Sequence, residues 1–338
     1  MKYCVYKSSE LNHEAVQVEA LKALQEIAEE LKNNPTILLP SEDIDYISDV
    51  AQNFSKKFDD IVVIGMGGAI LNPAMLLAIT HYNHKPNIYC LSDIESNTIS
   101  RIFDKLQPSR TGFVVISKSG NTLETLSITG AVIEWLNQNG INDLAYHMVF
   151  ITGNHMSPMV DMIKKFSIQH IVHSNISGRF ASFSSVVIFP ALLAGLDINL
   201  WLQTANLVMD DFIKQPLKHP VYYNLLSRYA AYKLGIKNNI IISFCERLHN
   251  FTEWIAQMFA ESLGKNGHGI TPIRARGPLD NHSQLQLYLD GPKDKLINVL
   301  YVKQSKGLKI SNQVPIPAIH NKYIEDVLHA EYSAFISS

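Results

Sequence analysis

The chain has 338 residues, of which 46% are hydrophobic and 18% are charged, and its formal net charge is −2. This composition is typical of a globular protein and allows two domains or one large α/β unit. The balanced charge, with no basic stripe among aromatic residues, argues against a nucleic-acid partner and against binding to an acidic membrane. Cys4, Cys90 and Cys245 lie far apart in the sequence, so we expect no metal site built from cysteines.

The sequence also lacks the marks of membrane insertion or secretion. The N-terminal stretch MKYCVYKSSE has no apolar core of the kind found in a signal peptide. The longest apolar run, VVIFPALLAGL, is too short to cross a bilayer. We therefore expect a cytoplasmic protein without a membrane partner.

The first part of the chain predicts alternating helices and strands. Helix-forming residues with apolar positions at helical spacing predict a leading helix at 11–32, within an N-terminal helical segment at 1–45. Residues 61–64 predict a short buried strand, which is followed by a glycine turn and an apolar helix. Further strands are predicted at 87–93, from Thr111 onward, at 147–154 and at 169–174. Continuous apolar strands that alternate with helices indicate a parallel sheet covered on both faces.

The pattern weakens after residue 199 into helices, with KQPLKHPVYYN as a candidate linker. It then resumes with strands predicted at 238–246 and 295–302 and with a helix from His249 to Leu263. We therefore predict two α/β domains, at 46–200 and 201–338.

Residues 117–122, SKSGNT, follow a predicted strand and precede a predicted helix. A helix N-terminus offers unpaired N–H groups and a positive dipole end, so hydroxylated residues there can enclose a phosphate. Ser117, Ser119 and Thr122 can donate from their side chains, and Gly120 allows a close approach of the backbone. The alternative is ordinary capping, because Ser, Asn and Thr are preferred at any helix start.

A second strand-end loop, GMGGA at residues 65–69, matches neither the dinucleotide fingerprint nor a phosphate-binding loop with a following lysine. We therefore expect no NAD and no nucleotide cofactor. Two strand-end loops of one parallel sheet converge on the crevice where open α/β sheets bind ligands. This convergence favours a binding site over two unrelated turns.

Three polar residues outside these loops are candidates for chemistry. Arg179, just ahead of a predicted helix, could stabilise an oxyanion or could lie on the surface. Glu261 shares a helix face with Glu253 and Gln257, which predicts a solvated stripe, but a carboxylate in the last turn opposes the helix dipole and is a hint of function. His282 is one of 13 histidines, and a lone histidine is more often structural than catalytic.

Five clusters in this order resemble the glucose-6-phosphate isomerase family, also called phosphoglucose isomerase. They are GMGGA, SKSGNTLET, SGRFASFSSVVIFPALLAGLDI, AQMFAESLGKNG and DNHSQLQLYLDG, and they run from about residue 60 to 291. The resemblance implies two sugar-isomerase (SIS) domains, each a doubly wound parallel sheet in an αβα sandwich. It also implies a cytosolic homodimer with shared active sites, no metal or cofactor, and interconversion of glucose 6-phosphate and fructose 6-phosphate.

The resemblance assigns substrate and phosphate binding to Gly67, Gly68, Ser117, Lys118, Ser119, Thr122 and Gln257. Lys118 would act through its backbone N–H, and the two glycines would let the first loop approach the sugar.

The resemblance also implies three catalytic residues. Glu261 would be the base that moves a proton between C1 and C2, and Arg179 would stabilise the cis-enediolate. His282 would help to open the sugar ring, reaching in from the partner subunit. Aldose–ketose isomerisation by proton transfer needs a base, a cation near the enediolate oxygens and an acid for the ring oxygen, and these residue types supply one of each.

Two departures from the family pattern keep alternatives open. Ala69 stands where the family commonly has serine, and the sequence ends at HAEYSAFISS without the family's QPGVExxK-like motif. We therefore expect either a truncated chain or a diverged member. The alternatives to an active isomerase are a catalytically impaired sugar-phosphate-binding protein, a bifunctional phosphoglucose/phosphomannose isomerase, and a regulator that uses an SIS domain as a sensor.

Overall fold

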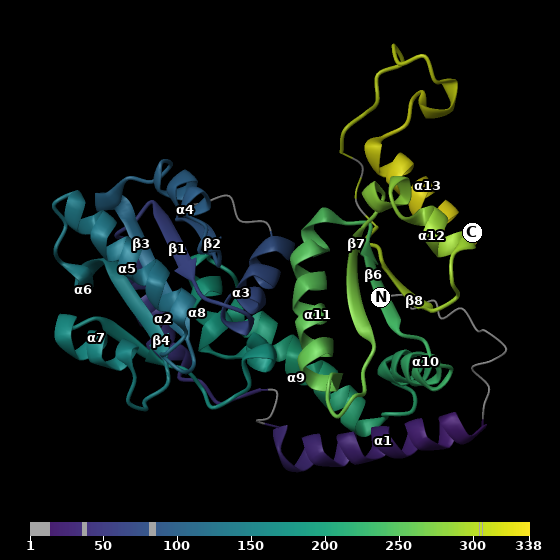
Figure 1. The fold of residues 1–338 in the computed structure, drawn as a ribbon, viewed down its shortest axis with the longest axis horizontal. Coiled ribbons are helices and arrows are strands. Elements are labelled where there is room, and N and C mark those ends of the chain that lie inside the picture. The colour runs from purple at the N-terminus through teal and green to yellow at the C-terminus, as the bar shows by residue number, and fades with distance from the viewer. Residues whose placement is uncertain (1–13, 36–38, 81–85, 304, 306) are drawn as a thin grey trace. The chain divides into compact units, whose positions relative to one another are not determined.

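A computed structural model of the chain describes residues 14–35, 39–80, 86–303, 305 and 307–338. The described residues form two compact units, one of Gln17–Tyr223 and one of Asn224–Ser338 together with the residues from Glu14 to Val16. Each unit contains its own parallel sheet with helices beside it (Figure 1). The predicted α/β fold with parallel sheets is confirmed.

The first unit is built on five parallel strands, and their order places a switch point in the middle of the sheet. The strands are β1 (Asp60–Ile64), β2 (Asn87–Leu91), β3 (Thr111–Ser117), β4 (Met148–Thr152) and β5 (Gln169–Val172). Their order is β2-β1-β3-β4-β5, so the chain adds β2 on one side of β1 and then crosses to the other side for β3. The loops after β1 and β3 leave the sheet on opposite faces at such a point, and the crevice between them is where ligands bind.

One face of this sheet is covered by α5 (Leu123–Gln138) and its neighbours. Ile128 and Leu136 of α5 are buried in one cluster with Phe113 of β3 and Phe150 of β4. The continuous apolar sequences of β3 and β4 are explained by this environment, because strands covered on both faces contact helices with every residue.

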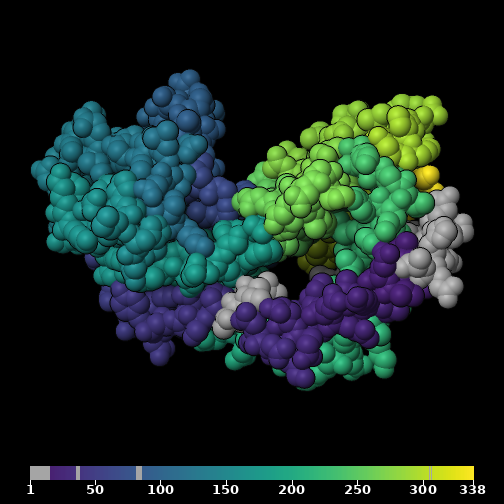
Figure 2. All heavy atoms as spheres, turned by 60° about the horizontal axis from the view of Figure 1, so that its bottom comes forward, coloured from purple at the N-terminus to yellow at the C-terminus, as the bar shows by residue number. Residues whose placement is uncertain are grey.

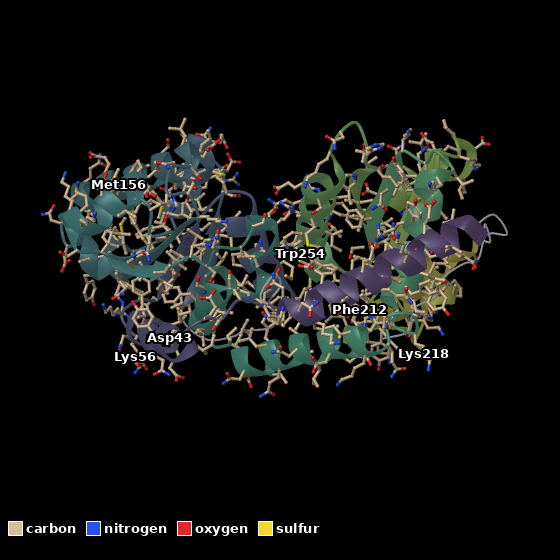
Figure 3. The ribbon with its side chains drawn as sticks, turned by 90° about the horizontal axis from the view of Figure 1, so that it is seen from below. Asp43, Lys56, Met156, Phe212, Lys218 and Trp254 are labelled. Atoms are coloured by element: carbon tan, nitrogen blue, oxygen red, sulfur yellow. The ribbon has the colours of Figure 1, made fainter. Side chains whose placement is uncertain are left out.

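The opposite face is covered by α2 (Ile44–Ser55), α3 (Gly68–Ile79) and α8 (Ser185–Leu193). Gly112 of β3 leaves room for them, because a Cβ there would lie 2.6 Å from the Phe58 ring and 2.8 Å from that of Phe54. The helix α2 begins after Asp43, whose carboxylate accepts a hydrogen bond from the Tyr46 N–H, and it ends before Lys56; Asp43 and Lys56 are labelled in Figure 3. The unit also contains α1 (Glu14–Asn33) from Gln17 onward, α4 (Ser96–Phe103), α6 (Leu144–His147), α7 (Pro158–Phe166), the 3-10 helix η4 (Gly178–Phe183) and α9 (Ile198–Lys214). The central strands are buried and add little to the molecular surface, which Figure 2 shows with its atoms coloured from purple at the N-terminus to yellow at the C-terminus.

The second unit has three parallel strands, β6 (Asn238–Ser243), β7 (Thr271–Arg276) and β8 (Lys295–Leu300). Their order is β7-β6-β8, which repeats the arrangement β2-β1-β3 of the first sheet. The helices are α10 (Val221–Lys233), α11 (His249–Leu263), α12 (Leu285–Asp290) and α13 (Ile324–Ser337). The core is smaller than in the first unit, and Phe335 of α13 packs against the buried cluster that contains Ile242 and Phe244.

Most of the predicted elements are present, and one strand was missed. The leading helix predicted at 11–32 is α1, and its first three predicted residues lie outside the described part of the chain. The helix predicted from His249 to Leu263 is α11 with the same bounds. The sequence TPIRAR of β7 was not predicted as a strand, because charged residues interrupt the apolar run on which the prediction relied. Within the described residues, no helix combines the length and the hydropathy that a membrane span requires.

Candidate active site

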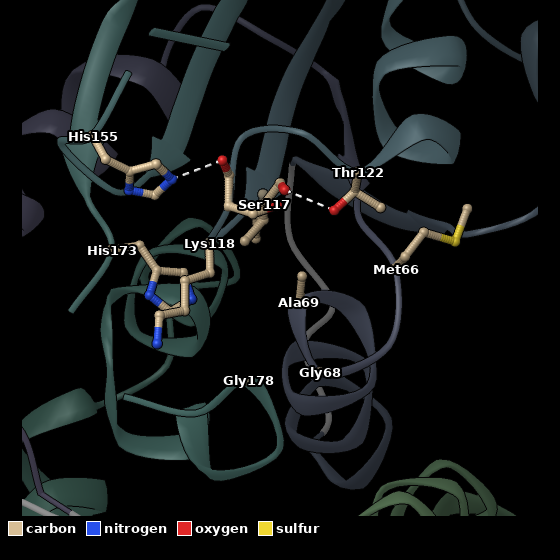
Figure 4. A pocket seen from close by; sticks show the side chains of 11 residues that line it. Met66, Gly68, Ala69, Ser117, Lys118, Thr122, His155, His173 and Gly178 are labelled. Atoms are coloured by element: carbon tan, nitrogen blue, oxygen red, sulfur yellow. Dashed lines mark hydrogen bonds between the residues drawn. The ribbon is translucent and has the colours of Figure 1, made fainter. Parts of the chain in front are cut away.

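A cavity of about 380 Å³ lies at the switch point of the first sheet, between the loops that follow β1 and β3 (Figure 4). Its volume is within the range of small-molecule sites. Five residues predicted to bind substrate or phosphate line it: Gly68, Ser117, Lys118, Ser119 and Thr122. The predicted convergence of the two strand-end loops is therefore confirmed.

The segment 117–122, called the hydroxyl loop below, does not use its hydroxyl groups for ordinary helix capping. Thr122 is the N-cap residue of α5, but its side chain makes no capping hydrogen bond. Its hydroxyl lies instead 3.0 Å from the Ser117 hydroxyl, at the edge of the cavity (Figure 4). This arrangement disfavours the capping alternative, because the hydroxyls face each other and the cavity.

Hydrogen bonds from the loop after β4 and from the first turn of α7 hold the hydroxyl loop from outside. The N–H groups of Gly153 and Met159 donate to the carbonyls of Lys118 and Gly120, at 3.2 and 3.3 Å. The Nε2 atom of His155 lies 2.8 Å from the Ser119 carbonyl oxygen between them. Three successive carbonyl oxygens are thus engaged by a neighbouring segment, which reduces the repulsion that they would exert on a bound anion.

Gly120 is required for this packing between the two loops. Its φ of +62° lies in the left-handed region that favours glycine. A Cβ at this position would lie 2.3 Å from the Ser157 hydroxyl oxygen and 2.8 Å from the Ser157 Cβ. A larger residue would therefore push the loop after β4 away from the hydroxyl loop.

The glycine loop after β1 makes a close backbone contact with the segment before α8. Gly67 precedes α3 with a φ of +54°. A Cβ on Gly68 would lie 2.3 Å from both the carbonyl carbon and the carbonyl oxygen of Gly178. Only glycine at position 68 permits this approach, which brings the backbone beside Arg179 to the cavity.

Asn72 stabilises the backbone contact between Gly68 and Gly178 through buried hydrogen bonds. Its side chain is fully buried, and its amide donates to the carbonyls of Gly68, at 2.6 Å, and Gly178, at 2.9 Å. Its side-chain oxygen accepts a hydrogen bond of 2.6 Å from the Ser182 hydroxyl. Asn72 therefore joins α3 to η4, and the sequence prediction overlooked it because it lies inside an apolar helix.

Arg179 is half-buried directly after Gly178, which lines the cavity. Its Nη1 donates to the Ser177 hydroxyl at 2.8 Å, and its guanidinium lies 4.6 Å from the centre of the Phe180 ring. These contacts hold the cation beside the cavity. Ala69, where the family commonly has serine, lines the cavity with a methyl group.

The sequence prediction overlooked two histidines in the cavity wall, His155 and His173. His155 follows the strand predicted at 147–154, and His173 lies near the end of the strand predicted at 169–174 and directly after β5. The carboxyl ends of parallel strands are where ligands bind, so this position was the available signal. His173 is only 5% exposed, and its Nδ1 lies 2.7 Å from the Ser174 carbonyl oxygen. Burial, and to a lesser extent the charge of Lys118, lower the pKa of His173 below its ordinary value.

A carboxylate behind the cavity wall fixes the segment that carries His173. The Ser174 hydroxyl and the Ser185 N–H, which is at 3.0 Å, both donate to Oε1 of Glu42. Ser185 is the first residue of α8, so Glu42 is placed where the helix dipole favours a negative charge. Burial raises the pKa of Glu42 above its ordinary value, against the lowering effect of these hydrogen bonds.

The other predicted site residues lie in the second unit. Gln257 and Glu261 are one turn apart on α11, and the Gln257 amide donates to Glu261 at 2.6 Å. Glu261 is exposed, and His282 is exposed at the end of the 3-10 helix Leu279–His282. The catalytic roles of these residues stay predictions. Among the described residues, no group of three or more His, Cys, Asp or Glu side chains is arranged to hold a metal ion.

The fold and the cavity define an α/β protein of the doubly wound class, with a ligand site at the switch point of its first sheet. The sequence pattern of the family described as phosphoglucose isomerase matches residues 41–273, and the chain belongs to this family. The resemblance noted in the sequence is thereby confirmed.

Individual relatives agree with this assignment. The glucose-6-phosphate isomerase of Methanocaldococcus jannaschii is 33% identical over 284 residues, which cover 82% of this chain and 69% of the relative. A protein of Methanococcus maripaludis named "Probable glucose-6-phosphate isomerase" is 35% identical over 265 residues, which cover 76% of this chain. The chain spans 60% of the length of this second relative.

A solved structure of similar fold is a glucose-6-phosphate isomerase from Chlamydia trachomatis, with a TM-score of 0.74 and 19% identity. The match covers 94% of this chain and 71% of the other. At this level of identity the comparison establishes a shared fold.

Proposed function

We propose that this protein is a glucose-6-phosphate isomerase, which interconverts glucose 6-phosphate and fructose 6-phosphate through a cis-enediolate. The observation that carries the proposal is the hydroxyl loop at the switch-point cavity, where Ser117 and Thr122 face each other and neither caps α5. Membership of the phosphoglucose isomerase family and the names of the relatives support the choice of substrate.

The phosphate of the substrate would occupy the cavity at the N-terminus of α5. Hydroxyl groups of Ser117, Ser119 and Thr122 would donate to it, Lys118 would supply backbone N–H and positive charge, and the helix dipole would favour the anion. Binding far from the reacting carbons would orient the sugar, so that binding energy is used to position C1 and C2.

The reaction would follow from three residues in their predicted roles. Glu261 would take the C2 proton of the open-chain aldose while the C–H electrons form the enediolate. Arg179 would stabilise the negative oxygen, the hydroxyl proton on O2 would pass to O1, and return of the proton from Glu261 to C1 would give the ketose. His282 would protonate the ring oxygen as the ring opens, and Gln257, bonded to Glu261, would contact the substrate.

The assembly and location belong to the same proposal. We infer a cytoplasmic homodimer with active sites shared between subunits, built from two SIS domains at 46–200 and 201–338 after an N-terminal helical segment at 1–45. Light scattering coupled to size-exclusion chromatography measures the oligomeric state directly. A monomer that turns over substrate would refute the shared site.

The test of the reaction is conversion of fructose 6-phosphate to glucose 6-phosphate, followed with a coupled dehydrogenase. Glu261→Gln keeps the side-chain length and removes the base, so we expect turnover to fall at least a hundredfold. Glu134→Gln is the matched control, because Glu134 is also exposed on a helix and accepts a hydrogen bond from a glutamine four residues away, at 2.9 Å. Stabilisation by fructose 6-phosphate without turnover would support the sugar-phosphate-binding alternative instead.

A further inference from the structure

We propose that His173 is a further ligand-binding residue, which contacts the bound phosphate beside Lys118 and takes up a proton when the dianion enters the cavity. The inference rests on the proposed function in one respect, namely that the ligand carries a doubly charged anionic group. Neither the resemblance nor the proposed reaction gives His173 a role.

The geometry of His173 leaves one ring nitrogen for a ligand. Its Nδ1 faces the Ser174 carbonyl oxygen at 2.7 Å, and because a carbonyl can only accept, Nδ1 carries a hydrogen. In the neutral ring Nε2 is then an acceptor, which a phosphate oxygen would repel. Protonation turns Nε2 into a charged donor, and charge-assisted hydrogen bonds to phosphate are the strong ones. His173 lines the cavity and is only 5% exposed, so such a bond would be little screened by water.

The charge balance of the cavity favours proton uptake with the ligand. Figure 4 shows the Lys118 side chain beside the His173 ring, and its charge disfavours a second cation there while the cavity holds no anion. Among the described residues that line the cavity, Lys118 is the one with a permanent positive charge. A dianion would carry one negative charge that Lys118 does not balance. Arg179 lies beside the cavity and is bonded to Ser177, so we assign the compensation of this charge to a proton on His173.

Other titratable groups around His173 have different tasks. His155 also lines the cavity, but its Nε2 is engaged by the Ser119 carbonyl, so it holds the hydroxyl loop. Glu42 is bonded to the Ser174 hydroxyl behind the wall, and Arg179 is bonded to Ser177. These groups define the controls, because a change in the charge of Glu42 or His155 could also make binding depend on pH.

Sulfate is the probe for the test, because it keeps two negative charges across the range where histidine titrates. We would measure its affinity for the full chain by calorimetry between pH 5.5 and 8.5, with fructose 6-phosphate as a second ligand. For the wild type we expect the affinity for sulfate to fall about tenfold per pH unit at most as His173 loses its proton. In His173→Asn we expect this dependence to be at least halved, while the asparagine amide replaces the Nδ1–H donor to Ser174.

The matched controls are His155→Gln, whose amide can replace the Nε2 donor, and Glu42→Gln. Both should keep the pH dependence of sulfate affinity, and its loss in either variant but not in His173→Asn would overturn the inference. Turnover together with pH-independent sulfate affinity would reject the inference alone. Lack of turnover together with a pH dependence that His173→Asn removes would reject the proposed reaction and support the inference. Failure of both sulfate and fructose 6-phosphate to bind would reject both.

Discussion

Replacing Gly68 by alanine tests whether the backbone contact between the glycine loop and Gly178 builds the cavity. The added Cβ would lie 2.3 Å from Gly178 carbon and oxygen atoms and 2.9 Å from the Arg179 nitrogen. These neighbours are backbone atoms, so no side chain can rotate away to relieve the overlap. The two segments must separate by about 1 Å to restore ordinary van der Waals distances.

The cost of the substitution follows from two terms. Overpacking of a buried contact costs about 1–3 kcal/mol. Separation also weakens the bonds from Asn72 to the carbonyls of Gly68 and Gly178, which adds about 1 kcal/mol. We therefore expect Gly68→Ala to lower the free energy of unfolding by about 2–4 kcal/mol and to weaken sulfate and fructose 6-phosphate binding.

Urea unfolding followed by circular dichroism measures the stability, with Gly130→Ala as the matched control. Gly130 lies within α5 in the same unit, and a Cβ there would meet nothing within 4 Å. Because alanine is favoured over glycine inside a helix, this control should gain about 0.5–1 kcal/mol. Equal stability and equal ligand affinity of Gly68→Ala and the wild type would refute the close contact.

Three further substitutions test the surroundings of the cavity. Asn72→Ala should lower the free energy of unfolding by about 2–4 kcal/mol, because it leaves buried polar groups without partners. The control Asn87→Ala removes only an exposed hydrogen bond, so it should change the free energy of unfolding by less than about 0.5 kcal/mol in the same urea titration. Ser117→Ala should weaken sulfate binding about three- to tenfold by calorimetry, and unchanged affinity would contradict the role of the hydroxyl loop. The pKa of Glu42 is raised in the folded protein, so the native state binds this proton more readily than the unfolded chain does. The stability that Glu42 contributes is therefore lost as the pH rises above the ordinary glutamate range. Glu42→Gln should flatten this part of the stability–pH curve measured by thermal unfolding, and a curve as steep as that of the wild type would contradict the assignment.

The first sheet and one side of the cavity could be predicted because the signals are local. The apolar residues FVVI of β3 are fully buried only if helices cover both faces of the sheet. The small polar residues that follow them stand at the strand end, where open α/β sheets bind ligands. Ser117, Ser119 and Thr122 were predicted in this way, whereas Lys118 was predicted from the family resemblance, and all four line the cavity.

What could not be predicted depends on contacts between distant segments. The role of Asn72 becomes visible only when Gly178, more than 100 residues away, lies against Gly68. His173 looks like any histidine of the sequence until its burial and its bond to the Ser174 carbonyl are known. β7 was missed for a different reason. The prediction relied on continuous apolar runs, whereas β7 alternates apolar and charged residues, as a half-exposed strand does.

The central claim is that Glu261 moves a proton between C1 and C2 of a hexose 6-phosphate. The most direct measurement is NMR of fructose 6-phosphate incubated with the protein in D₂O. We expect glucose 6-phosphate to form with solvent deuterium at C2, because an enediolate mechanism lets the proton on the base exchange with water, and we expect Glu261→Gln to abolish both conversion and exchange. Conversion without deuterium incorporation, or exchange that persists undiminished in Glu261→Gln, would contradict the account.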